Sequence, residues 1–336
     1  MAHDDPAHRH HCESLPPRAC GGRLVIAPVS PVVLWFLGGL YLILITASIS
    51  IRIIRPKLTP ASYHELYLRI RSWWIMITVF SVAILLSRRA SLIFFGFVSF
   101  LALKEYFSII PTRRADRRVL FWAYLCIPIQ YFFAANGRYG MFLVFIPVYA
   151  FLFIPLRMLT IGETKDFHRA LSTIHWGLMT TVFSISHIAF LLVLNRFNTA
   201  IIGAGLVLFL VALTQFNDVA QFMWGKTCGK RKIMPKVSPN KTWEGFIGGI
   251  GSTTFLGTLL GPVLTPMDWK FSMAAGLIIG IGGFIGDVTV SALKRDLGIK
   301  DTGSMLPGHG GILDRIDSLT YTAPLFFHFI FFFYCR

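Results

Sequence analysis

Residues 271–286 are FSMAAGLIIGIGGFIG, sixteen residues without a charged side chain, and Asp287 follows directly. A helix needs about 20 predominantly apolar residues to cross the hydrocarbon core of a bilayer. A carboxylate at the edge of that core is costly unless a partner compensates its charge, so it indicates a functional site. The stretch therefore predicts a membrane helix that ends in an acidic group, with a bound cation and the nearby Lys294 and Arg295 as compensating charges.

The composition extends this prediction to the whole chain. Of its 336 residues, 54% are hydrophobic and 14% are charged, whereas a soluble chain carries about 25% charged residues. The ten apolar segments lie at 32–51, 73–87, 90–103, 119–135, 139–156, 172–194, 199–216, 245–265, 271–291 and 318–335. The predicted fold class is all-α, a polytopic integral membrane protein with about ten transmembrane helices. The range is 8–10, because the second and third segments are short enough to be tilted spans, a re-entrant pair, or one disrupted pair around Ser87, Arg88 and Arg89.

The positive charge is arranged as in membrane proteins. The net charge is +16, and the Lys and Arg residues lie between the apolar runs, as loop charges do in membrane proteins. We therefore expect no nucleic acid as a partner. With ten spans and both ends outside, most of the 32 basic residues fall on the inner side. This orientation places the loops 217–244 and 292–317 on the cytoplasmic side, where nucleotides are available.

The chain is expected to have three parts. Residues 1–30 form a polar tail rich in His and Pro, which we expect to be disordered. Residues 31–200 are expected to form N-terminal transmembrane helices, and residues 201–336 a C-terminal catalytic transmembrane region. The five cysteines show no CxxC spacing, and no GxSxG, HExxH or Walker motif is present. The commonest hydrolase, metalloprotease and ATPase functions are therefore excluded.

The first candidate cluster follows the uncharged run. Asp287, Ser291, Lys294 and Arg295 have the spacing i, i+4, i+7, i+8, which places them on one face of a helix. The functional interpretation is a metal ligand, Asp287, with Lys294 and Arg295 holding phosphate. An ion pair between helices together with ordinary loop charges is the alternative.

The second cluster lies near the C-terminus. The glycines of the segment 307–311, PGHGG, let the backbone approach a ligand and offer N–H donors to phosphate. Asp314 and Asp317 share a face at the start of the last helix, where acids can also simply complement the helix dipole. Asp314 can share a divalent cation with Asp287 only if their helices pack side by side. The residues of this cluster expected to bind substrate are His309, Gly310, Gly311 and Arg315.

Two further segments are candidates for substrate binding. Ser238 followed by Pro239 predicts a helix start, with Ser238 as N-cap. A helix N-terminus beside Lys241 and Thr242 would bind an anion, although a capped membrane helix with a basic loop is the alternative. Asp218, at the end of the seventh apolar segment, is expected to hold a cation, orient a nucleotide or cap a loop.

These motifs together resemble a known family. Residues 291–317 match the pattern S-x-L-K-R-x4-K-D-x-G-x2-L-P-x-H-G-G-I-x-D-R-I-D, which resembles at every fixed position the signature of phosphatidate cytidylyltransferases, the CDP-diacylglycerol synthases. Residues 238–249, SPNKTWEGFIGG, resemble a second hallmark, and 105–107, EYF, a weaker one. The resemblance is strong over 201–324. The chain is most similar to the bacterial branch, with a paralogue of the principal enzyme as an alternative.

The resemblance implies a reaction in which CTP and phosphatidate give CDP-diacylglycerol and pyrophosphate. It implies Mg²⁺ held by Asp287 and Asp314, with K⁺ as an optional further cation. It also implies a location in a bacterial inner membrane, with the site facing the cytoplasm and membrane lipids as partners. A homodimer is a further expectation that the sequence leaves open. The residues expected to be catalytic are Asp287, Asp314, Lys294, Arg295 and Asp317.

The same chemistry is physically reasonable for these residues. A phosphate monoester has a second pKa of about 6, so it is largely dianionic at neutral pH and needs no general base. Repulsion between two anions is the obstacle, and Lys241, Lys294 and Arg295 would hold the triphosphate or the departing pyrophosphate. One departure is 218–222, DVAQF, where many members have D-x-G-A-Y. The alternatives are a CTP-dependent transferase or kinase acting on another lipid phosphate or polyprenol, and a cation-coupled transporter.

Overall fold

The protein is a bundle of long helices. The computed structural model describes residues 30–57, 59–111, 117–198, 202–303, 305 and 310–335, so the expected tail, except Ser30, and His309 lie outside the described residues. Within the described part, ten helices are long and apolar enough to cross a membrane. This confirms the prediction of an all-α, polytopic integral membrane protein.

In the part that the structure describes, the first half of the chain forms six spans, of which the fifth and sixth each contain a π-helical segment. The first four are α1 (Pro31–Ile54), α2 (Pro60–Leu86), α3 (Arg88–Ile109) and α4 (Arg117–Ala135). The fifth is α5 (Tyr139–Val144), a π-helical segment (Phe145–Ala150) and α6 (Phe151–Leu159), and the sixth is α7 (Phe167–Gly177), a π-helical segment (Leu178–Phe183) and α8 (Ser184–Leu191).

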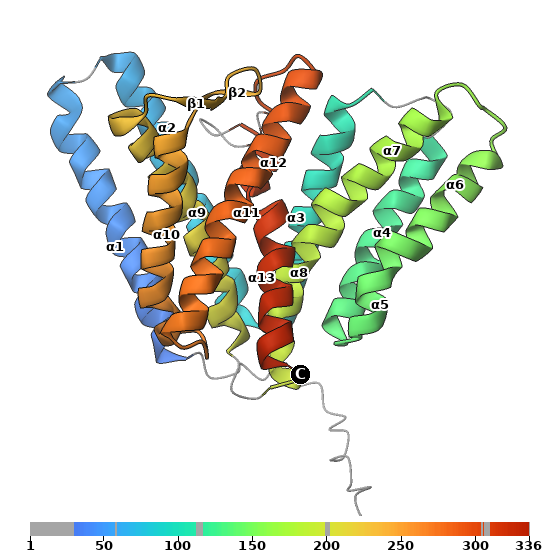
Figure 1. The fold of residues 1–336 in the computed structure, drawn as a ribbon, viewed down its shortest axis with the longest axis horizontal. Helices are drawn as coiled ribbons and strands as arrows, with labels where there is room; N and C mark the ends of the chain where they lie inside the picture. The colour runs from blue at the N-terminus through green and yellow to red at the C-terminus, as the bar shows by residue number, and fades with distance from the viewer. Residues whose placement is uncertain are drawn as a thin grey trace, which may run out of the picture.

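The second half holds four spans and a small hairpin. Its elements are α9 (Gly203–Cys228), β1 (Lys232–Met234), β2 (Ser238–Thr242), α10 (Trp243–Leu264), α11 (Trp269–Asp296), α12 (Leu313–Ile316) and α13 (Leu319–Tyr334). Figure 1 shows the hairpin and the connection between α1 and α2 at the same end of the bundle, opposite the C-terminus. The large side chains of Phe142, Phe190, Phe209, Phe326 and Phe327 are fully buried and come from both halves of the chain.

The two short apolar segments are two full spans. α2 begins at Pro60, thirteen residues before the predicted start at 73, and α3 follows after Ser87 alone. Thr59 caps α2 by accepting a hydrogen bond from the Ser62 N–H. This capped start, with Pro at the first position, lies before the apolar run, so the helix includes a more polar segment of thirteen residues that hydropathy alone does not reveal.

The predicted helix start at Ser238 is wrong. Ser238 pairs with Met234 and Thr242 with Lys232 in the antiparallel β1–β2 hairpin. The helix α10 begins only at Trp243, where the Thr242 hydroxyl accepts a hydrogen bond from the Gly245 N–H at 3.1 Å. Strand pairing holds the backbone at Ser238 in an extended conformation, so the capping function falls to the second hydroxyl residue of the segment.

Close helix packing in the second half depends on glycine. A Cβ atom at Gly276 of α11 would lie 2.9 Å from the Thr254 Cα of α10, and one at Gly286 would lie 2.5 Å from the Asp317 carbonyl oxygen. Real Cβ atoms do not approach that closely, so larger residues would push the helices apart. α11, which carries Asp287, therefore packs closely against α10 and against the turn at Asp317 between α12 and α13.

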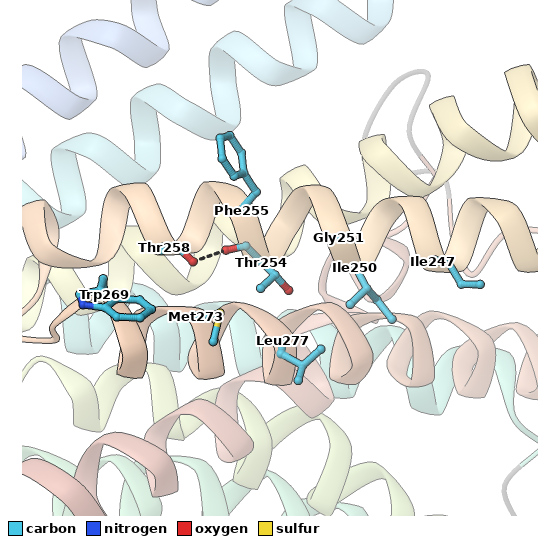
Figure 2. A pocket seen from close by; sticks show the side chains of 9 residues that line it. All are labelled: Ile247, Ile250, Gly251, Thr254, Phe255, Thr258, Trp269, Met273 and Leu277. Atoms are coloured by element: carbon cyan, nitrogen blue, oxygen red, sulfur yellow. Dashed lines mark hydrogen bonds between the residues drawn. The ribbon is translucent and has the colours of Figure 1, made fainter.

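An apolar cavity of about 610 Å³ lies between α10 and α11 on the outside of the bundle. Figure 2 shows Ile250, Met273 and Leu277 among the side chains that line it, and the Thr258 hydroxyl donating to the Thr254 carbonyl within α10. None of its lining residues is charged. This side of the helix pair therefore suits contact with lipid chains.

Candidate active site

One face of α11 carries the charged residues that the spacing predicted. The Ser291 hydroxyl donates to Asp287 Oδ1 at 3.3 Å, as residues one helical turn apart can. Lys294 lies seven residues beyond Asp287, which is ~10 Å further along the helix axis. The two residues form separate ion pairs with two different segments of the chain.

The first ion pair joins the hairpin to two helices. Lys241 Nζ of β2 lies 2.5 Å from Asp287 Oδ2 of α11 and donates to Gln221 Oε1 of α9 at 3.0 Å. About a fifth of each charged side chain is exposed, 19% for Lys241 and 21% for Asp287. Because partial burial lowers the local dielectric, the Coulomb attraction between the two charges is screened less than in a fully exposed pair. The arrangement holds a primary amine directly over the carboxylate that the sequence singled out.

Gln221 is a site residue that the sequence did not reveal as one. It lies in the segment 218–222, which departs from the family pattern. Its side chain is 3% exposed, and among the described residues its Nε2 has no hydrogen-bond partner. The amide therefore holds Lys241 through its oxygen and leaves two N–H donors beside the ion pair.

The second ion pair binds the last motif to α11. Lys294 Nζ lies 2.8 Å from Asp314 Oδ1. Asp314 Oδ2 accepts hydrogen bonds from the Thr302 N–H at 2.9 Å, the Thr302 hydroxyl at 2.9 Å and the Gly311 N–H at 3.1 Å. Gly310 has a φ of +79°, a conformation that glycine adopts readily and that turns the backbone toward this carboxylate.

A carboxylate from the first half of the chain completes this arrangement. Glu105 of α3 accepts hydrogen bonds from the Ile312 N–H at 2.8 Å and the Leu313 N–H at 3.0 Å. The Thr302 hydroxyl lies 2.5 Å from Glu105 Oε1 and 2.9 Å from Asp314 Oδ2, so the two carboxylates share its single proton. Glu105 is 8% exposed. Glu105 thus holds the start of α12, and the sequence signalled it only through the weak EYF resemblance at 105–107.

Two further carboxylates, Asp218 and Asp317, lie near Asp287. Asp218 accepts a hydrogen bond from the Ser318 hydroxyl at 3.0 Å, and Asp317 accepts one from the Ser318 N–H at 2.7 Å. Asp287 repels both of them electrostatically, and Asp218 also repels Asp317. A group of mutually repelling carboxylates suits a hard cation in charge and ligand type.

The described residues do not include a complete metal site. No group of three or more His, Cys, Asp or Glu among them is arranged to hold a metal ion. Asp287 and Asp314 each contact a lysine, and Asp314 also has three further donors. A cation shared by Asp287 and Asp314 would need these contacts to rearrange and stays a prediction, whereas Asp218 and Asp317 lie within electrostatic range of Asp287.

The remaining predicted residues take different positions. Arg295 Nε donates to the Val237 carbonyl oxygen at 3.2 Å, so it holds the turn of the hairpin. The Arg315 Nε is buried and has no hydrogen-bond partner among the described atoms, and its charge attracts Asp218. Thr242 caps α10. His309 falls outside the described residues.

Comparison with known proteins identifies the family of this chain. The sequence profile described as "Cytidylyltransferase family" matches residues 67–333, most of the chain. The chain belongs to the cytidylyltransferase family. This cytidylyltransferase is therefore a nucleotide-transferring enzyme built from membrane-spanning helices, and the family assignment disfavours the transporter alternative.

Individual relatives differ in what is known of them. The protein is 46% identical over 294 residues to the uncharacterized protein YnbB of Escherichia coli strain K12. The aligned residues cover 88% of this chain and 97% of YnbB. The chain is 33% identical over 211 residues to the phosphatidate cytidylyltransferase of Bacillus subtilis, covering 62% of this chain and 75% of that enzyme. With the Synechocystis phosphatidate cytidylyltransferase it is 43% identical over 114 residues, 34% of this chain and 39% of that enzyme.

Proposed function

We propose that the protein is a phosphatidate cytidylyltransferase, which converts CTP and phosphatidate into CDP-diacylglycerol and pyrophosphate. The observation that carries this proposal is the pair of lysine–aspartate contacts on α11, Lys241–Asp287 and Lys294–Asp314. They place two ammonium groups in one charged cluster between membrane helices, with Arg315 nearby. A cluster of this kind suits two phosphate-bearing substrates, one from solution and one from the bilayer.

The reaction needs charge compensation more than proton transfer. A phosphatidate oxygen forms a bond to the α-phosphorus of CTP, and the bond from that phosphorus to the bridging oxygen breaks to release pyrophosphate. The attacking monoester is already largely dianionic, because its second pKa is about 6. Lys241 and Lys294 would leave their aspartate partners and bind phosphate oxygens, so that they supply positive charge to the reacting groups. Arg295 on α11 would add to this positive charge.

A divalent cation, Mg²⁺, is part of the proposal. Asp287, with Asp314 as the expected partner and Asp218 and Asp317 within range, would hold it, and the mutual repulsion of Asp218, Asp287 and Asp317 supports this choice. When bound, the ion neutralises the charge of the CTP phosphates. K⁺ as a second cation and a homodimer remain part of the same expectation.

The proposed location is a bacterial inner membrane with the site facing the cytoplasm. The basic residues of the loops support it, since they gather on the side of the motif loops. The hairpin and the connection between α1 and α2 lie at that same end of the bundle (Figure 1). Phosphatidate can then reach the site laterally while its acyl chains stay in the bilayer.

The test is release of labelled pyrophosphate from CTP by the purified protein in detergent. We expect release that depends on both phosphatidate and Mg²⁺, and that is lost in Asp287→Asn. Polyprenol phosphate and other lipid phosphates are assayed in parallel, because the departure from the family pattern at 218–222 makes a different acceptor the second candidate. Release with another lipid phosphate but not with phosphatidate rejects the proposed acceptor.

A further inference from the structure

A second cavity, which unlike the first has charged residues in its lining, lies between α1 and α2. Its volume is about 220 Å³. The lining residues that matter here are Ser48, Arg52, Tyr63, Tyr67, Arg71 and Trp74. It lies in the halves of α1 and α2 next to their connection, at the end of the bundle that also carries the hairpin (Figure 1). The cavity therefore lies toward the membrane boundary on the side of the motif loops.

The charge of this cavity is not balanced within the protein. Residues 30–86 contain five Lys and Arg and a single acid, Glu65. Glu65 already has a partner, because Arg69 Nη2 lies 2.6 Å from Glu65 Oε1. Arg52 and Arg71 are exposed, and neither has an acidic partner among the described residues. Two guanidinium groups thus face one small cavity without a carboxylate to pair with.

The walls of the cavity are held in place by aromatic contacts. Trp74 Nε1 donates to the Ser48 hydroxyl at 3.1 Å and so joins α2 to α1. Tyr41 packs against Trp74 with ring centroids 5.8 Å apart, and the Arg55 guanidinium lies 5.2 Å from the centre of the Tyr63 ring. Trp and Tyr are the residues that prefer the boundary between lipid and water. The cavity thus combines a fixed aromatic wall with a positively charged rim.

Phosphate is the group that fits such a rim. A guanidinium presents a planar fork of N–H donors that matches the oxygens of a phosphate. At the boundary of the bilayer, the phosphates within reach belong to lipid head groups, and anionic lipids attract basic residues there. The side chains of Ile51 and Ile70 add apolar surface for the glycerol end of a lipid.

The cavity is separate from the proposed reaction site. The family match begins at residue 67, so α1 and the first residues of α2, including Arg52 and Tyr63, lie outside it. α1 also contacts α9 and α10, which carry Gln221 and Thr242 or adjoin them. A ligand at the α1–α2 cavity would therefore contact α1 and α2, and α1 would connect it to α9 and α10 of the reaction site.

We infer that the α1–α2 cavity binds the phosphate of an anionic phospholipid from the leaflet on the side of the motif loops. This goes beyond the proposed function, since the lipid at this site is not consumed. A phosphodiester lipid such as phosphatidylglycerol fits, because it carries one negative charge and has no phosphate monoester to react with CTP.

The test is a binding titration of the full chain, delipidated in neutral detergent, with dioctanoylphosphatidylglycerol. No CTP or phosphatidate is present, so the result does not depend on the proposed reaction. We expect Arg52→Gln with Arg71→Gln to weaken binding at least tenfold. The matched control is Lys57→Gln with Arg69→Gln, which removes the same charge outside the cavity, from the connection after α1 and from α2. It is expected to change binding less than threefold.

Further arms identify the source of the phosphate and guard against misfolding. Dioctanoylphosphatidylcholine, which has no net charge, should bind at least tenfold more weakly, and inorganic phosphate should not displace the lipid at equal concentration. Arg52→Lys with Arg71→Lys keeps the charge and loses the forks, so it should weaken binding at least threefold even if the glutamine pair does not fold. Equal loss in both glutamine pairs, unchanged binding in the lysine pair, or displacement by free phosphate overturns the inference.

Discussion

Replacement of Glu105 by glutamine is the sharpest test of the site described here. Glu105 accepts hydrogen bonds from the Ile312 N–H, the Leu313 N–H and the Thr302 hydroxyl, and it is 8% exposed. A glutamine has only one acceptor oxygen, and its NH₂ group would face a donor. At least one hydrogen bond to a charged group is therefore lost, which costs about 1.5–3 kcal/mol.

The consequence is expected in both stability and activity. Release of the segment that carries Gly311 moves Asp314, because both are held by the same group of contacts. If the whole cost falls on the transition state, CTP turnover drops about 10- to 150-fold. The measurement is pyrophosphate release together with thermal unfolding in detergent. Glu65→Gln is the control, because Glu65 is exposed and among the described residues its ion-pair partner is Arg69. Turnover of Glu105→Gln within threefold of the parent refutes the reasoning.

Four substitutions and the removal of divalent cations have expected outcomes. Lys294→Ala leaves the buried Asp314 without its ammonium partner, and we expect a loss of at least about 10²-fold in kcat, with a loss under threefold contradicting the assignment. Asp287→Asn and Asp314→Asn should each remove most of the activity while membrane insertion, followed by fractionation, persists, and near-normal turnover would speak against both roles. Gln221→Ala frees Lys241 from its amide contact and should raise the KM for CTP about three- to tenfold, measured by CTP titration; an unchanged KM would make the contact structural only. Chelation with EDTA should abolish turnover and added Mg²⁺ should restore it, whereas full activity in EDTA would remove the cation from the proposal.

Much of the helical architecture could be read from the sequence because hydropathy reports membrane helices directly. The ten apolar segments correspond to the ten candidate spans. The face of α11 was predictable for a similar reason, since helical periodicity fixes which side chains of one helix share a side, as the Ser291–Asp287 contact shows.

Contacts between distant segments could not be read in the same way. Nothing local to Glu105 indicates that it caps a helix start 207 residues later. The error at Ser238 has the same origin: capping preferences favoured a helix, but pairing with Met234 imposes an extended backbone. The partner of Asp287 also depends on the fold, because Lys241 reaches it from a hairpin that the sequence did not predict.

The bond between Glu105 and the start of α12 has a consequence for biosynthesis. The ribosome adds about 5–20 residues per second, so with a separation of 207 residues the acceptor is made roughly 10–40 seconds before its backbone donors. During that interval the α3 carboxylate has to be accommodated by water or by temporary neighbours. The arrangement around Glu105 can therefore form only after α12 has been synthesised, and a nascent chain that stops before α12 has inserted most of its spans and still lacks these contacts.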